Sequence, residues 1–155
     1  LMDWIQTICT TPSMTCPAVV RRADELCLGL RFTDDSTITS LNSTWRQRTQ
    51  ATDVLSFAAL EEAPAMQDLS SVELGDIVIS LDTARRQASE REHSLNRELR
   101  WLVSHGLLHL LGWDHPDEAS LAAMLQLQEQ LLEGGGNVQA TELYPVDTTV
   151  DGNAR

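Results

Sequence analysis

Three of the four histidines fall within eleven residues, in the stretch HGLLHLLGWDH at positions 105–115. On an α-helix, His105 and His109 lie one turn apart on the same face, about 6 Å along the axis. Two imidazoles at that spacing can hold one metal ion. Gly112 is placed to end the helix, so that the chain can turn and bring His115 back as a third ligand. The spacing therefore predicts a metal site made of three histidines.

The chemistry of such a site depends on its fourth position. Three neutral imidazoles leave one corner of a tetrahedral zinc ion open for water, which is typical of catalytic zinc sites. A bound metal lowers the pKa of that water toward about 7. Nitrogen ligands favour Zn²⁺, and we expect one ion per chain. His93 lies outside the pattern and is expected to be a surface or capping residue.

The spacing H-x3-H-x2-G-x2-H also matches that of the metzincin proteases. In those enzymes a glutamate general base follows the first histidine, whereas Gly106 stands there in this chain. Peptide hydrolysis would lack its usual proton acceptor, which disfavours a protease without excluding it.

A third hypothesis is an assembly factor with a mainly structural metal. An open coordination position would count against it, because structural sites fill all four positions with protein ligands.

The elements that must position the histidines follow from hydrophobic periodicity. A long helix is expected over residues 94–111, with Ser94 as its N-cap. Other helices are expected over residues 18–30, 36–45, 81–92 and 116–133. Strands are expected over residues 30–33, 53–60 and 72–80, with loops over residues 46–52 and 61–71. The fold class is therefore α+β: a small mixed sheet of three to four strands, packed against four to five helices, with the metal site at the C-terminal end of a central helix.

Charge is unevenly distributed along the 155 residues, whose net charge is −12. Residues 61–80 hold five acids and no base, and residues 116–155 hold seven acids and one arginine, while the rest is nearly neutral. All eleven basic residues are arginines, whose planar fork suits phosphate or carboxylate. We expect one hydrolase domain over residues 1–133 and an acidic, disordered tail over residues 134–155.

The sequence predicts a cytoplasmic protein with no membrane partner. No apolar stretch approaches the roughly 20 residues of a membrane span, and the start LMDWIQTICTTP lacks the basic region of a signal peptide. The three cysteines, Cys9, Cys16 and Cys27, are odd in number and form no CxxC pair. They are expected to be free thiols in a reducing compartment, without a disulfide-linked partner.

Several blocks of the chain resemble one known family. HGLLHLLGWDH is similar to the signature HGxLHLxGYDH of the YbeY family, the bacterial rRNA maturation factors and endoribonucleases. Further blocks agree in order between about residue 26 and residue 133: LNSTWR (41–46), TDVLSF (52–57), LGDIVIS (74–80) and MLQLQEQLL (124–132). The departures are Trp45 and Trp113 in place of tyrosines, Gln50-Ala51 in place of Lys-Pro, and Ala58 in place of proline. The lost prolines leave the 46–52 loop less rigid.

The resemblance implies a zinc-dependent endoribonuclease. It would take part in ribosomal RNA processing, especially maturation of the 3′ end of 16S rRNA, and in ribosome quality control. Its implied partners are ribosomal RNA, the small ribosomal subunit and ribosome-associated proteins. It also implies that His105, His109 and His115 are the metal ligands and that Arg46 is the functional arginine. An arginine fork can neutralise the negative charge that develops on the phosphate during RNA cleavage.

The sequence does not determine which group acts as the general base. Asp114 is a candidate because it precedes a ligand, but it could equally orient an imidazole or cap the turn. Alternatively, the ribose 2′-hydroxyl is the nucleophile, and little base strength is needed from the protein. Ser56, Thr52 and Arg48 are candidates for substrate contact. Because the chain is so acidic, we expect it to bind free RNA weakly and to gain specificity by docking on the ribosome or on a basic partner protein.

Overall fold

The computed structural model describes residues 1–12, 14–60 and 70–134. A three-stranded sheet has the order β1-β3-β2, with β1 at Leu26–Thr33, β2 at Val54–Ala58 and β3 at Val72–Ser80. β1 runs parallel and β2 antiparallel to the central β3, so the sheet is mixed as predicted. The helices in this part of the chain are α1 (Met2–Thr10), α2 (Ala18–Arg22), α3 (Asp35–Arg46), α4 (Leu81–Glu90), α5 (Leu95–Leu110) and α6 (Glu118–Gly134). The α+β class is confirmed, with six helices in the described residues instead of four or five.

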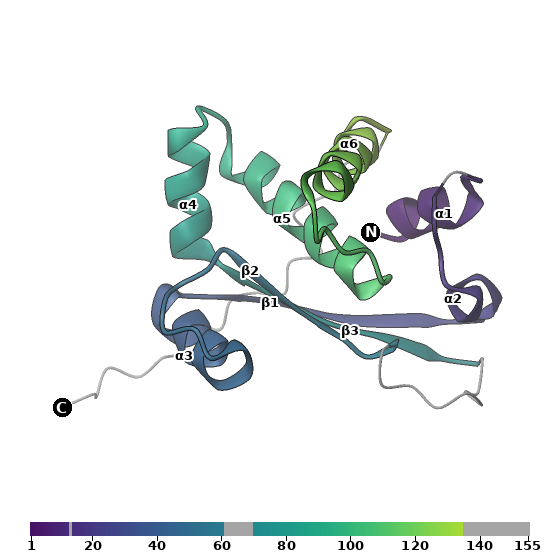
Figure 1. The fold of residues 1–155 in the computed structure, drawn as a ribbon, viewed down its shortest axis with the longest axis horizontal. Coiled ribbons are helices and arrows are strands. Elements are labelled where there is room, and N and C mark those ends of the chain that lie inside the picture. The colour runs from purple at the N-terminus through teal and green to yellow at the C-terminus, as the bar shows by residue number, and fades with distance from the viewer. Residues whose placement is uncertain (13, 61–69, 135–155) are drawn as a thin grey trace.

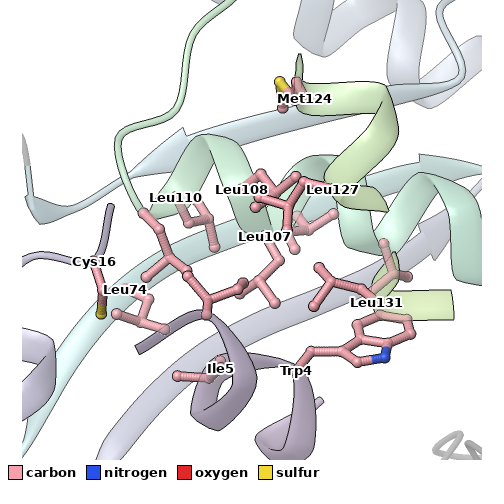
Figure 2. Packing of buried hydrophobic residues seen from close by; sticks show 14 of the residues in the cluster. Trp4, Ile5, Cys16, Leu74, Leu107, Leu108, Leu110, Met124, Leu127 and Leu131 are labelled. Carbon is pink, nitrogen blue, oxygen red and sulfur yellow. The ribbon is translucent and has the colours of Figure 1, made fainter. Parts of the chain in front are cut away.

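One face of the sheet carries the main core. α5 lies across this face, α6 packs on α5, and α1 lies beside them and adds its buried side chains to the same core (Figure 1). Ile77 and Ile79 of β3 point into this layer and are fully buried, as are Leu107 and Leu108 of α5 (Figure 2). Each such side chain stabilises the fold by roughly 1.5–3 kcal/mol relative to exposure. This packing fixes the position of α5, the helix that carries His105 and His109.

The opposite face of the sheet is covered by α3 (Figure 1). Ile38 of α3 packs there on Leu55 of β2 and Val78 of β3, in a much smaller cluster. The N-terminus of α3 is tied to the junction of β3 and α4 by Asp35, whose carboxylate accepts hydrogen bonds from Ser80 (2.6 Å) and Thr83 (2.7 Å). These two bonds, and less so an ion pair with Arg86, lower the pKa of Asp35 to about 2.

The structure corrects the prediction for residues 18–30. The helix after Pro17 ends at Arg22, and β1 begins at Leu26 rather than at residue 30. The apolar side chains at positions 26, 28, 30 and 32 alternate, and all four pack against the main core. This two-residue period is that of a strand, and it overrides the helical spacing read from the preceding residues.

The N-terminal helix α1 was not predicted. Trp4, Ile5 and Ile8 form its buried face and belong to the main core. Their spacing of i, i+1 and i+4 suits a short amphipathic helix. The stretch is only nine residues long, and what stabilises it is contact with distant parts of the chain.

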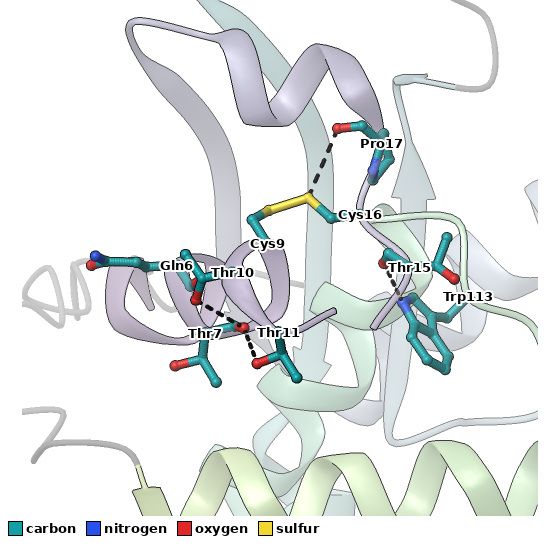
Figure 3. Close-up of a disulfide and its surroundings, with 9 residues drawn as sticks. All are labelled: Gln6, Thr7, Cys9, Thr10, Thr11, Thr15, Cys16, Pro17 and Trp113. Atoms are coloured by element: carbon teal, nitrogen blue, oxygen red, sulfur yellow. Dashed lines mark hydrogen bonds between the residues drawn. A yellow bond between two sulfur atoms is a disulfide. The ribbon is translucent and has the colours of Figure 1, made fainter. Parts of the chain in front are cut away.

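The prediction of three free thiols is wrong for two of the cysteines. Cys9, near the end of α1, forms a disulfide with Cys16 in the segment that leads to α2 (Figure 3). The turn after α1 brings their Cα atoms to 5.2 Å, within the range that a disulfide spans. A separation of seven residues does not reveal this proximity in the sequence. Cys27 is a free thiol, as predicted.

Two further predictions concern the 61–71 loop with the acidic tail, and the absence of a membrane span. Most of the 61–71 loop and the acidic tail lie outside the described residues, apart from Gly134 at the end of α6. In the part of the chain that the structure describes, no helix combines the length and apolar character that a bilayer crossing requires.

Candidate metal centre

The C-terminal end of α5 positions the first two histidines. Ser94 caps the start of the helix by accepting a hydrogen bond from the backbone N–H of Arg97 (3.2 Å). The apolar side of α5 packs on the sheet, which leaves His105 and His109 half-buried on another side. The structure thus confirms Ser94 as the N-cap of this helix and places His105 and His109 on one face of it.

The turn after α5 brings the third histidine back. Gly112 has a φ of 90°, in the left-handed region that side chains rarely adopt, and its N–H donates to the carbonyl of His109 (3.0 Å). The Trp113 indole N–H donates to the carbonyl of Thr15 (3.0 Å), which holds this turn against the segment beside the disulfide (Figure 3). His115 then faces the helix, with ring centroids 5.6 Å from His105 and 5.2 Å from His109.

The geometry of the three imidazoles fits a single cation. One nitrogen from each ring can be chosen so that all three lie within 4.8 Å of one another. The Nε2 atoms of His105 and His109 are 3.1 Å apart. Burial, together with the neighbouring His105 and His115 rings, lowers the pKa of His109 to about 4, although the Trp113 backbone and Asp114 act in the opposite direction. His109 is therefore neutral near pH 7, as a metal ligand must be.

A buried glutamine orients His105. Gln128 of α6 is fully buried, and its Oε1 lies 3.1 Å from Nδ1 of His105. Its Nε2 donates to the Trp101 carbonyl (3.1 Å) and the Ser104 hydroxyl (3.2 Å), so the amide oxygen is the atom that faces the imidazole. An amide oxygen only accepts hydrogen bonds, which places the proton of His105 on Nδ1 and leaves the Nε2 lone pair for a metal.

Gln128 was not predicted as a site residue, although its place in the sequence carried a signal. Met124, Leu127, Gln128 and Leu131 are the buried residues of α6, at the i, i+3, i+4 and i+7 spacing of one helix face. A single amide within an otherwise apolar stripe needs a hydrogen-bond partner inside the protein. That partner is 23 residues away in sequence and could not be identified without the fold.

The histidines form one wall of a cleft of about 510 Å³. The other lining residues come mainly from the end of α3, the loop after it and β2: Arg46, Thr52, Asp53, Val54, Ser56, Ala58, Gly112, Trp113 and Asp114. Arg46 is the one arginine among them, and its Nη2 donates to the carbonyl of Ser56 (3.2 Å). The structure thus brings Arg46, Ser56 and Thr52 into the same cleft as the three histidines.

Arg48 lies outside the cleft lining, whereas Asp114 has the capping role that was one of its predicted alternatives. The backbone N–H of Arg48 donates to the carbonyl of Asn42. Asp114 lines the cleft, but its Oδ1 accepts from the backbone N–H of His115 (2.8 Å), which caps the turn before the third histidine. In the described part of the chain, no hydrogen bond joins Asp114 to an imidazole.

Asp53 is a second carboxylate in the cleft that sequence analysis did not single out. Its Oδ1 accepts from the backbone N–H of Val54 (2.8 Å), and its Oδ2 accepts from the amide of Gln87 on α4 (3.1 Å). The position at the start of a strand in the matched TDVLSF block was the available signal. The cleft therefore holds one arginine and two carboxylates beside the histidines.

The position of the metzincin glutamate has no room for a side chain here. Gly106 packs directly on β3, where a Cβ atom would lie 2.8 Å from Cγ2 of Ile77. The residue after the first histidine therefore faces the sheet and not the cleft. A glutamate at this position, which serves as the proton acceptor in a metzincin protease, would collide with Ile77.

The fourth histidine, expected to be a surface or capping residue, lies just before α5, and its backbone N–H donates to the Ala88 carbonyl at the end of α4. His93 is only 22% exposed, and its Nε2 pairs with the carboxylate of Glu98. Glu98 is fully buried and also forms an ion pair with Arg91.

Comparison with known proteins gives consistent matches. The profile of the family described as "Endoribonuclease YbeY" matches residues 2–136. A protein of that name from Parasynechococcus marenigrum (strain WH8102) is 78% identical over 154 residues, 99% of this chain and 83% of that protein. Another from Synechococcus sp. (strain CC9605) is 67% identical over 135 residues, 87% of this chain and 81% of that protein. The solution structure of TM1509 from Thermotoga maritima is similar with a TM-score of 0.49 and 26% identity, over 74% of this chain and 71% of that one.

Proposed function

Because the chain belongs to the endoribonuclease YbeY family, we propose that it is a metal-dependent endoribonuclease that cuts ribosomal RNA in the histidine-lined cleft. The observation that supports this proposal most strongly is the convergence of three imidazoles and one arginine on a single cleft. A purely structural metal would be enclosed by protein ligands on all sides. Here the three histidines face an open cleft instead.

His105, His109 and His115 would hold the metal, for which we propose zinc because imidazole nitrogens suit it. When bound, the ion would supply positive charge beside the phosphate and lower the pKa of a coordinated water. Contacts within the chain orient two of these imidazoles and set their protonation without a bound ion. Burial keeps His109 neutral, and Gln128 turns the Nε2 lone pair of His105 toward its neighbours.

Arg46 would bind the scissile phosphate. One of its nitrogens is engaged with the Ser56 carbonyl, which steadies the guanidinium at the rim of edge strand β2. The other N–H groups of the fork remain to donate to a non-bridging phosphate oxygen. Their interaction strengthens as negative charge builds up at phosphorus, and this stabilises the transition state more than the ground state.

The two carboxylates of the cleft, Asp53 and Asp114, would have different roles. Asp114 positions His115 through the backbone N–H, as its hydrogen bond indicates. Asp53 lines the same cleft and can accept a proton from the attacking hydroxyl. Ser56 and Thr52 add hydroxyl groups to the cleft, where they can bind the sugar–phosphate backbone.

A cleavage assay tests the proposal. Structured RNA and casein are incubated with the purified chain, with and without a chelator. We expect metal-dependent cutting of RNA, no cutting of casein, and loss of RNA cleavage in Arg46→Ala and His109→Ala. Arg48→Ala is the matched control, because this arginine lies outside the cleft lining, and it should retain cleavage. Cleavage that persists in His109→Ala, or digestion of casein, would contradict the proposal.

The ribosomal substrate is tested separately. We propose that the 3′ end of 16S rRNA is a target and that the chain reaches it in the cytoplasm by docking on the small subunit or on a ribosome-associated protein. A net charge of −12 supports docking, because free RNA is repelled by so acidic a chain. Co-sedimentation with small subunits, and cutting of a 16S precursor within them, are expected. Tight, salt-resistant binding of a short isolated RNA would contradict the need for docking.

A further inference from the structure

A second hollow of about 970 Å³ borders the metal cleft. It lies over the face of the sheet that α3 covers, and its walls come from β1, α3, β2 and β3. Arg46, Ser56 and Ala58 line both the metal cleft and this hollow. The two hollows therefore adjoin along edge strand β2, and an extended chain held at the histidines would reach the second hollow on leaving the first.

The most prominent feature of this hollow is an exposed indole. Trp45 is 67% exposed, more than the other large apolar side chains in the described part of the chain. It stands edge-on to Phe57, with ring centroids 6.1 Å apart and an angle of 72° between the rings. This contact limits the orientations of the indole while leaving most of its surface in solvent. Trp45 is the residue before Arg46, so the indole and the guanidinium leave the same turn of α3 toward adjoining hollows.

The charges around the hollow suit a nucleic acid strand. Arg31 of β1 is exposed and lines it, and Arg46 lies where it meets the metal cleft. One acid opposes them: Asp76 of β3, whose carboxylate lies over Gly29, where a Cβ atom would be 1.9 Å from its Oδ1. Two cations against one anion give a small positive excess in a chain that is otherwise acidic. Stacking is therefore expected to provide more of the affinity here than charge.

We propose that this hollow binds single-stranded RNA next to the scissile bond, with a base stacked on Trp45 and a phosphate bound by Arg31. The proposal rests on the proposed RNA cleavage and adds a base-stacking subsite, formed by Trp45, beside the scissile bond. A base must leave its own helical stack to lie on an indole, so paired RNA is excluded from this position. Stacking on an aromatic ring tolerates any base, so the subsite reads strandedness more than sequence.

Steady-state cleavage of a ten-nucleotide single-stranded RNA provides the first test. In Trp45→Ala we expect KM to rise about ten-fold, with kcat within about two-fold of wild type, because stacking holds substrate and transition state alike. Trp45→Phe should recover most of the loss. Leu125→Ala removes an exposed apolar side chain from α6 and is the matched control that should change neither constant. An unchanged KM in Trp45→Ala would overturn the proposal.

A binding experiment separates this inference from the proposed catalytic activity. In His109→Ala, a ten-nucleotide oligouridylate should quench indole fluorescence, and most of the quenching should be lost when Trp45→Phe is added, the remainder coming from Trp113 in the metal cleft. One abasic position in the oligonucleotide should weaken binding about ten-fold in chains with Trp45 and have no further effect in Trp45→Ala. If wild type cuts no RNA but the quenching depends on Trp45, the subsite stands and the catalytic proposal fails. If RNA is cut and neither quenching nor KM depends on Trp45, the subsite fails alone.

Two measurements complete the test. Arg31→Ala should make the dependence of log affinity on log salt shallower by about 0.7, the value for one phosphate contact on a single strand, while Arg31→Lys should leave it unchanged. Sedimentation over a range of concentrations examines the other occupant, a second copy of the chain. Self-association that Trp45→Ala abolishes would overturn the proposal in favour of a dimer interface.

Discussion

The two ends of α5 each hold a cluster of polar side chains that includes histidine, and they are built in opposite ways. At the N-terminal end, Glu98 is fully buried and is paired with Arg91 and His93. At the C-terminal end, three imidazoles face one another across an open cleft. In the described residues, their hydrogen bonds go to neutral groups or to one another: the Gln128 amide, the Trp113 backbone and the neighbouring ring.

This difference distinguishes a structural cluster from a ligand site. A buried carboxylate is costly unless it is paired, and the protein supplies both partners of Glu98 itself. Among residues 1–12, 14–60 and 70–134, the three imidazoles have no hydrogen-bonded partner of opposite charge, and burial lowers the pKa of His109 to about 4. One nitrogen of each ring lies within 4.8 Å of the other two, and in the described residues no carboxylate is hydrogen-bonded to these rings. Such an arrangement can hold a cation from outside the chain.

The largest expected effect comes from exchanging a histidine at either end. His109→Ala should lower RNA cleavage by on the order of 1,000-fold through loss of the metal, and change the free energy of unfolding of the metal-free chain little. His93→Ala should do the reverse, with normal cleavage and lower stability. Cleavage rates and urea titrations of both variants measure this. Equal loss of activity in the two would remove the distinction between the ends.

Arg46 and Arg91 make the corresponding pair of arginines. Arg46→Ala should reduce kcat by about 100- to 1,000-fold, because a donor to the developing phosphate charge is lost. Arg91→Ala should leave kcat unchanged, since its guanidinium pairs with Glu98 far along α5 from the cleft. The comparison is made in single-turnover cleavage with saturating enzyme. A wild-type kcat in Arg46→Ala would show that the arginine has no part in the chemical step.

Gln128 tests how the open cluster is held ready. Gln128→Leu keeps the approximate volume but removes the oxygen that orients His105, so metal affinity should fall about 10- to 100-fold. Competition with a chromogenic chelator measures the change. The fold should tolerate the substitution, because the other buried residues of α6 are apolar. Unchanged affinity would mean that His105 needs no such partner.

Glu98 tests the closed cluster directly. Glu98→Gln keeps the shape of the side chain but removes its charge, and should lower the free energy of unfolding by about 2 kcal/mol. Cleavage per folded molecule should stay within about two-fold of wild type, because the site lies at the far end of the helix. Urea denaturation gives the stability. A large loss of metal binding in this variant would show that the two ends are coupled.

The smallest effect concerns a third polar cluster, around Asp35. Hydrogen bonds from Ser80 and Thr83 lower its pKa from 3.8 to about 2. The stabilisation is therefore fully present above pH 4 and is lost as the pH falls through about 2. Asp35→Asn should be slightly less stable than wild type at pH 6, and the difference should shrink between pH 4 and pH 2. Thermal unfolding over this range measures it. A difference that does not depend on pH would mean that the carboxylate charge contributes nothing.

The contrast between the clusters also explains what the sequence could reveal. His105, His109 and His115 lie close together in the chain, so helix periodicity and one glycine sufficed to predict their convergence. Arg46 was indicated by the family motif. Gln128 and Asp53 meet the site through contacts formed only by folding. Glu98 looks like any solvent-facing acid in the first turns of a helix, and nothing nearby in the sequence marks it as buried.

The same distinction applies to the fold. β3 and α5 were predicted closely because their patterns are long and regular, whereas β1 was mistaken in part for helix because Pro17 and a helical spacing precede it. α1 and the disulfide between Cys9 and Cys16 depend on contacts with the core and on the turn between them. Local patterns predict elements, and they fail where tertiary contact decides.

Metal content measured on the purified chain and its four histidine variants tests the central claim most directly. After loading with zinc and extensive dialysis, wild type and His93→Ala should each retain one ion per chain. His105→Ala, His109→Ala and His115→Ala should retain almost none while remaining folded by circular dichroism. Full occupancy in all three of these variants, or loss of the ion in His93→Ala alone, would contradict the account.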